Sequence, residues 1–133
     1  MIVYPVEEDS SVKRDMDLVR DLLLRLEQDP NLDGTKWIHF TPADLEMAER
    51  SPKEIGYHLT MLIEEGFVKG KAGFEAIPIV FKLTWQGHEL LDSIRDPDIW
   101  SKTKKRIEGL ASVSLKVVFA IAEAEIKRKL GLA

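Results

Sequence analysis

The side chains that could carry out catalysis are few in this chain of 133 residues, and their spacing suits no known reaction centre. There are no cysteines, which excludes thiol nucleophiles, disulfides and thiolate zinc ligands. The three histidines, His39, His58 and His88, form no HExxH motif and no other pair at metal-binding spacing. Neither a Walker-type phosphate loop nor a GxSxG nucleophile motif occurs. We therefore expect no enzymatic activity, no cofactor and no metal site, and a packed structural role for His58.

Side chains suited to binding are more numerous than catalytic ones. They lie along one predicted helix and the hairpin that follows it. The exposed side of a helix expected at 52–65 carries side chains that suit either base edges or an apolar protein surface. Glu64 shares that side and would repel a phosphate backbone, whereas cations before the helix and in the hairpin suit phosphate contacts. The candidate DNA- or partner-binding residues are Arg50, Lys53, Tyr57, Thr60, Met61, Lys69 and Lys71.

The helix that positions most of these residues has clear start and stop signals. Ser51 suits the N-cap, Pro52 the first helical position, and Glu54 the third residue of a capping box. At about 100° per residue, the apolar side chains fall on one side of this helix. They are Ile55, Leu59, Leu62 and Ile63. Gly66 is the expected left-handed stop.

The remaining elements follow from apolar periodicity and turn residues. We predict a helix at 13–29, a short strand at 37–40, a short helix at 41–50 beginning at the Thr41–Pro42 cap, a two-stranded hairpin at 67–83, and helices at 84–95, 96–110 and 115–130. The glycine in the first turn of the helix at 84–95, Gly87, predicts close backbone packing.

This order of elements is that of a winged helix-turn-helix. We predict an α+β fold, mainly α, with an N-terminal extension at 1–12, a winged helix-turn-helix domain at 13–95 and a two-helix C-terminal extension at 96–133. The two last helices carry apolar stripes that must be buried against the domain or against a second copy. The stripes include Trp100, Ile107, Val118, Phe119 and Ile126. We expect a homodimer through these helices.

Charge is unevenly distributed along the chain, whose net charge is -4 and whose pI is about 5.4. Residues 1–50 carry -6, residues 51–95 carry -1 and residues 96–133 carry +3. We interpret this as mutual attraction between the two ends, in preference to contact of the basic end with phosphates. No apolar run approaches the roughly 20 residues of a membrane span, and the start lacks a basic signal-peptide region. We therefore expect a cytoplasmic protein without membrane contact.

Longer motifs resemble known proteins. The run from Tyr57 to Val68 and the "LT..G..LL" pattern beginning at Leu83 are similar to winged-helix proteins. The segments "KRDMDLVRDLLLRLEQD", "EIGYHLTMLIEEGFV" and "LTWQGHELLDSIRDPDIWSKTK" resemble a family of bacterial and prophage proteins catalogued as domain of unknown function 2513. That resemblance implies a winged-helix fold and a mobile-element setting, but it carries no activity and no functional residue to transfer.

Two functional hypotheses follow from these observations. The first is a DNA-binding transcriptional regulator of phage or mobile-element origin, which would place the helix at 52–65 on bases of double-stranded DNA and the wing on phosphates. The alternative is a winged-helix module for protein–protein interaction or dimerisation that uses the same residues without DNA. The sequence supplies about four cations for this surface, fewer than the roughly six to ten phosphate contacts of strong DNA binders.

Overall fold

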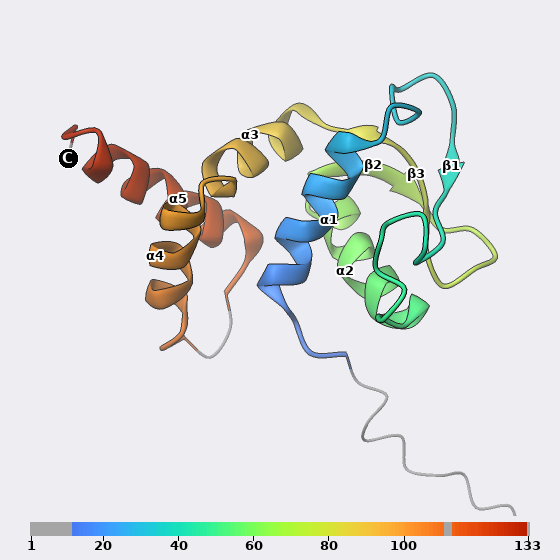
Figure 1. The fold of residues 1–133 in the computed structure, drawn as a ribbon, viewed down its shortest axis with the longest axis horizontal. Helices are drawn as coiled ribbons and strands as arrows, with labels where there is room; N and C mark the ends of the chain where they lie inside the picture. Colours follow the sequence, from blue (N-terminus) through green and yellow to red (C-terminus); the bar gives the residue numbers. More distant parts are fainter. Residues whose placement is uncertain (1–11, 111–112, 133) are drawn as a thin grey trace, which may run out of the picture.

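The computed structural model describes residues 12–110 and 113–132, so most of the predicted N-terminal extension lies outside the described residues. The fold is α+β and mainly α, as predicted from the sequence. The elements are α1 (Met16–Gln28), β1 (Ile38–His39), α2 (Pro52–Glu64), β2 (Val68–Lys71), β3 (Ile79–Leu83), α3 (Trp85–Ile94), α4 (Pro97–Ile107) and α5 (Leu115–Lys129). The sheet and α2 lie at one end of the molecule and α4 and α5 at the other, with α1 and α3 between them (Figure 1).

Helices α1, α2 and α3 begin at side-chain caps. Asp15 accepts a hydrogen bond from the backbone N–H of Leu18, and Ser51 accepts one from that of Glu54. Thr84 caps α3 in the same way. These bonds satisfy backbone donors that have no partner inside a helix, so the caps fix where each helix starts.

The prediction of a short helix at 41–50 is wrong, because the chain makes only one helical turn there. Thr41 and Asp44 form reciprocal backbone-to-side-chain hydrogen bonds, as in a capping box. Glu46 then adopts a left-handed conformation with φ 54°, and the N–H of Met47 donates to the carbonyl of Pro42 at 2.8 Å. This bond closes the turn as in a Schellman motif. Leu45 and Met47 are buried, so core packing is satisfied without a longer helix.

The three strands form an antiparallel sheet in the order β1-β3-β2. Lys69 pairs with Lys82 and Gly70 with Val80, which leaves Phe81 as an extra residue in β3. A bulge of this kind turns two successive side chains to the same face of a sheet. Accordingly, Val80 and Leu83 are buried, whereas Phe81 and Lys82 between them lie on the outer face.

Glycines allow two close backbone approaches that hold α2, the hairpin and α3 together. A Cβ built on Gly87 would lie 2.0 Å from the carbonyl oxygen of Phe67, which confirms the close packing predicted from the position of Gly87. A Cβ on Gly70 would lie 2.6 Å from Cδ1 of Ile63, so α2 covers the inner face of β2. Side chains could not be added at either position without moving a neighbour.

The C-terminal helices pack within the chain. Helix α5 lies against α3 and α4, and its residues join one continuous hydrophobic core with α1, α2 and the sheet. The predicted apolar stripes are covered there: Trp100 and Val118 are buried, and Ile107, Phe119 and Ile126 are half-buried. Contacts within one chain therefore account for these stripes, and a homodimer through α4 and α5 stays a prediction. In the described parts of the chain, every helix is too short or too polar to cross a membrane.

Candidate interaction surface on α2 and the hairpin

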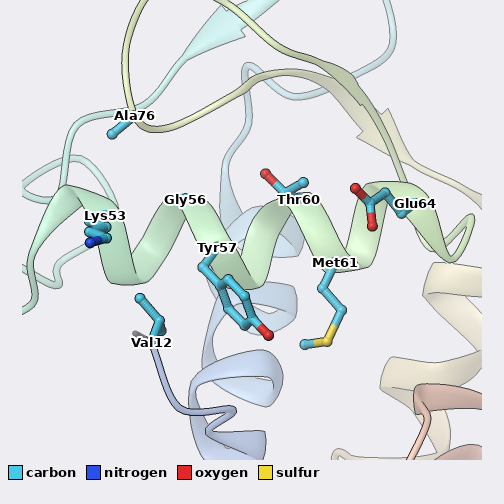
Figure 2. A pocket seen from close by; sticks show the side chains of 8 residues that line it. All are labelled: Val12, Lys53, Gly56, Tyr57, Thr60, Met61, Glu64 and Ala76. Carbon is cyan, nitrogen blue, oxygen red and sulfur yellow. The ribbon is translucent and has the colours of Figure 1, made fainter. Parts of the chain in front are cut away.

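A groove of about 800 Å³ runs along the exposed side of α2. Figure 2 shows Tyr57 and Met61 pointing to the same side of the helix, with Lys53 toward one end and Glu64 toward the other. Tyr57 is 43% exposed although most residues of its helix are buried or half-buried. The residues that line the groove are Val12, Lys53, Gly56, Tyr57, Thr60, Met61, Glu64 and Ala76. All four candidate residues predicted on α2 are therefore brought together in one groove.

Gly56 and Ala76 are members of this site that the sequence prediction missed. The loop between β2 and β3 folds back against α2, and a Cβ on Gly56 would lie 2.1 Å from the carbonyl oxygen of Ala76. Gly56 is buried for this reason, although it lies beside the exposed Tyr57. A glycine inside a helical pattern is a signal for close backbone approach. The loop is consequently a wall of the groove.

Arg50 is paired with carboxylates and does not extend from the surface as a free cation. Its guanidinium lies 3.1 Å from Asp15 and 3.3 Å from Glu54. Partial burial lowers the pKa of Arg50, but the hydrogen bond to Asp15 and the two nearby carboxylates raise it above its ordinary value. Glu54 therefore pairs with Arg50. The positive charge of Arg50, which was predicted to contact phosphates, is neutralised locally by these carboxylates.

Lys69 and Lys71 lie on a different surface, the outer face of the hairpin. The ammonium of Lys69 lies 4.8 Å from the ring centroid of Phe81, and that of Lys71 lies 4.4 Å from the ring centroid of Trp37. Since the neighbouring Gly70 faces Ile63 of α2, these lysines point away from α2. The seven predicted binding residues therefore divide into three sets: four lie in the α2 groove, Lys69 and Lys71 lie on the outer face of the hairpin, and Arg50 is paired.

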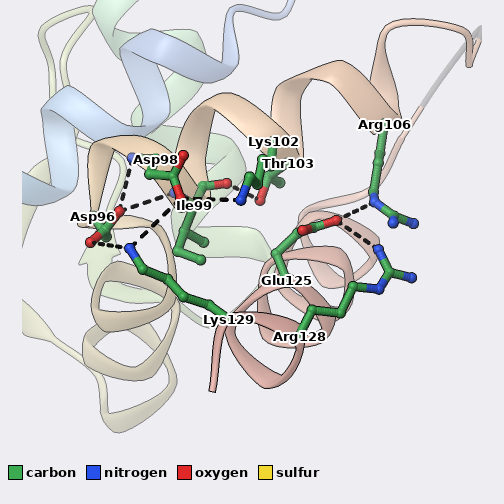
Figure 3. Close-up of polar contacts among 9 residues, drawn as sticks. All are labelled: Asp96, Asp98, Ile99, Lys102, Thr103, Arg106, Glu125, Arg128 and Lys129. Carbon is green, nitrogen blue, oxygen red and sulfur yellow. Dashed lines mark hydrogen bonds and ion pairs between the residues drawn. The ribbon is translucent and has the colours of Figure 1, made fainter. Parts of the chain in front are cut away.

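Several basic residues of the C-terminal part are paired with carboxylates, as Figure 3 shows. Glu125 is buried between α4 and α5 and forms ion pairs with Arg106 and Arg128. Lys129 lies 3.4 Å from Asp96 at the start of α4. These pairs are all formed within residues 96–133, so they connect α4 with α5 and do not join the two ends of the chain.

One ion pair joins the acidic and basic ends of the chain through α1 and α4. The indole N–H of Trp100 donates to Asp17 at 2.7 Å, and Lys104 lies 3.0 Å from the same carboxylate. Partial burial raises the pKa of Asp17, but the hydrogen bonds from Trp100 and Lys104 outweigh this effect and hold it below its ordinary value. This contact supports the predicted attraction between the two ends.

His58 is a packed residue rather than a ligand-binding one. It is fully buried; its Nε2 accepts a hydrogen bond from the N–H of Asp15, and its Nδ1 lies 2.8 Å from the carbonyl of Glu54. Both ring nitrogens are therefore used, and the ring ties the start of α1 to α2. Among the residues that the structure describes, no group of three His, Asp or Glu side chains is placed to hold a metal ion.

In the part of the chain that the structure describes, five helices and a small antiparallel sheet, with a hairpin after α2, form an arrangement that is compatible with a winged-helix-like protein. The chain belongs to the family described as "Hypothetical protein (DUF2513)", whose model matches residues 13–114. It is also similar to a protein of Haemophilus influenzae (strain ATCC 51907 / DSM 11121 / KW20 / Rd) described as "Uncharacterized protein". The two are 31% identical over 124 residues, which cover 90% of this chain and 99% of the relative. No solved structure matches the chain.

Proposed function

We propose that this protein is a winged-helix-like interaction module whose α2 groove binds an apolar segment of a protein partner. The observation that supports this most is the groove itself, where Tyr57 and Met61 are accessible beside a wall formed by the hairpin loop. Adaptable apolar side chains of this kind are enriched at protein interfaces. One cation and one anion, Lys53 and Glu64, would orient the bound segment.

Binding of double-stranded DNA by α2, as in a phage-derived transcriptional regulator, is the second candidate function. The winged-helix-like arrangement favours it, as does Lys53, which forms no ion pair with the residues that the structure describes. Against it, phosphate neutralisation supplies most of the affinity for DNA, and strong binders make roughly six to ten phosphate contacts. Lys53 is the cation that lines the groove, Glu64 opposes a phosphate there, and Arg50 is already paired. The apolar lining therefore favours a protein over DNA.

Photochemical cross-linking in cells tests this proposal even though the partner is unidentified. The full chain is produced with photoreactive benzoylphenylalanine at Tyr57, irradiated, and its adducts are identified by mass spectrometry. Trp85 is the matched control position, because it is an aromatic residue on a helix, 76% exposed and outside the groove. We expect a protein adduct from position 57 that is absent from position 85 and that disappears when Met61→Glu is added.

The other outcomes each refute the proposal in a recognisable way. An adduct with DNA alone would support the second candidate function. A cross-link within the same chain, to residues 1–11, would indicate that the chain fills its own groove. The same protein adduct from both positions, or no adduct from either, would leave the groove without a specific partner. Circular dichroism of the Met61→Glu variant would verify that its fold is intact.

A further inference from the structure

The outer face of the hairpin combines aromatic rings with lysines. The rings of Trp37 and Phe81 lie 5.0 Å apart, and each is covered by one ammonium group, from Lys71 and Lys69 respectively. Trp37 is 39% exposed although it precedes a strand of the sheet. The β3 bulge brings Phe81 to this face together with Lys82. We call this set, Trp37, Phe81, Lys69, Lys71 and Lys82, the hairpin face.

The lysines of the hairpin face differ from most cations of the helices. In the described parts of the chain Lys69, Lys71 and Lys82 form no ion pair, whereas Arg95, Arg106 and other helical cations pair with carboxylates. Like charges are also brought close here, because Lys69 and Lys82 are direct cross-strand partners. Opposed like charges destabilise a sheet. The hairpin face therefore carries positive charges that form no ion pair with the described residues, although Glu27 and Asp33 line one pocket with Lys82, and a bound polyanion would relieve the repulsion between the lysines.

We propose that the hairpin face binds single-stranded DNA, with bases stacked on Trp37 and Phe81 and phosphates on the lysines. An exposed cation–π contact is weaker than the stacking of a base on an aromatic side chain, so a base can displace an ammonium, which then moves to a phosphate. A duplex offers no free base face for such stacking. Stacking and phosphate contacts are common to DNA and RNA, and a 2′-hydroxyl can accept a hydrogen bond from an ammonium group, so a uridine 20-mer is compared with the thymidine 20-mer to distinguish the two.

This inference is independent of the proposed function, because the two surfaces share no residue. The hairpin face points away from α2, while the groove is lined by α2, Val12 and Ala76. Met61→Glu should therefore abolish partner binding in the groove and leave binding of single-stranded DNA unchanged. Conversely, Lys69→Gln with Lys71→Gln should leave the cross-link at position 57 intact.

Fluorescence anisotropy with a labelled thymidine 20-mer tests the hairpin face directly, over a range of salt concentrations and with the full chain. Loss of the two phosphate contacts in Lys69→Gln/Lys71→Gln should weaken binding and reduce the slope of log K against log salt by about 1.4. Phe81→Leu should weaken binding about tenfold without changing the slope, since it removes stacking but keeps charge and apolar volume. Lys105→Gln/Lys116→Gln is the matched control, because both lysines are exposed and lie on other elements.

Several results would overturn the assignment. They are absence of binding at low salt, equal affinity for the duplex of the same length, tighter binding of the uridine 20-mer, equal competition by polyglutamate, and wild-type affinity in Phe81→Leu. Equal losses in the control pair and in the Lys69/Lys71 pair would show that binding follows net charge rather than this face. Circular dichroism and thermal unfolding of each variant distinguish a loss of binding from a loss of fold. The Trp37→Phe variant keeps an aromatic ring and should retain most of the affinity for the thymidine 20-mer.

Discussion

The contact between Gly56 and the hairpin loop makes a quantitative prediction about stability. On an exposed helix, Gly→Ala is favourable by about 1 kcal/mol because alanine has the higher helix propensity. At Gly56 the new Cβ would lie 2.1 Å from the carbonyl oxygen of Ala76 and 2.9 Å from its carbonyl carbon. Since real Cβ atoms essentially never come closer than 3.0 Å to another atom, the loop would have to retreat by about 1 Å.

We expect the steric term to exceed the propensity term. Overpacking typically costs about 1–3 kcal/mol, and a clash with backbone atoms belongs in the upper part of that range, about 2–3 kcal/mol. After the helical gain of about 1 kcal/mol, Gly56→Ala should lower the free energy of unfolding by about 1–2 kcal/mol. Urea unfolding followed by circular dichroism measures this change. Gly109→Ala is the matched control: no atom lies within 4 Å of its added Cβ, and its stability should be unchanged or slightly higher. An unfolding midpoint for Gly56→Ala at or above that of the wild type would refute the packing argument.

Three further predictions concern acid stability, a buried histidine and assembly. The hydrogen bond from Arg95 holds the pKa of Glu27 below its ordinary value of 4.5, so stability from this pair is present above that pH and is lost as pH falls through the folded-state pKa. Glu27→Gln should flatten the acid limb of unfolding free energy by at most about 1 kcal/mol, and an unchanged acid limb would contradict this. His58→Leu should cost about 1–3 kcal/mol in urea unfolding, because the partly buried N–H of Asp15 and carbonyl of Glu54 each lose a hydrogen bond to the imidazole; wild-type stability would exclude that role. If α4 and α5 mediate a homodimer, light scattering should give twice the 15.1 kDa chain mass, and a strictly monomeric mass would exclude it.

Local signals predicted most of the elements of this fold correctly. The cap at Ser51 and the glycine at position 66 define α2 almost to the residue, because both act within one helical turn. Gly87 could be recognised as a packing glycine from its place in the first turn of its helix. The same kind of local signal gave a wrong prediction at 41–50. There a good cap is followed by Glu46 in a left-handed conformation, which depends on the burial of Leu45 and Met47 in the core.

The division of the candidate site could not be predicted from the sequence, because it depends on contacts between distant segments. The sequence predicts Lys69 and Lys71 on one surface with α2, but strand alternation and the packing of Gly70 on Ile63 turn them to the other face. The bulge at Phe81 is an effect of register, which two strands set together. Likewise, the pairing of Arg50 with Asp15 links residues 35 positions apart.

Paired and unpaired cations are distributed unevenly over the surface that the structure describes. Along the helices, many of the cations are paired with carboxylates of the same chain, so those charges stabilise the fold and are not available to a ligand. In the hairpin Lys69, Lys71 and Lys82 form no such pair among the described residues, and two of them cover aromatic rings. The α2 groove, in contrast, pairs an apolar lining with a single lysine. A helix of this kind suits a protein segment, whereas the hairpin suits a polyanion, so the element that resembles a recognition helix is the less suitable of the two for nucleic acid.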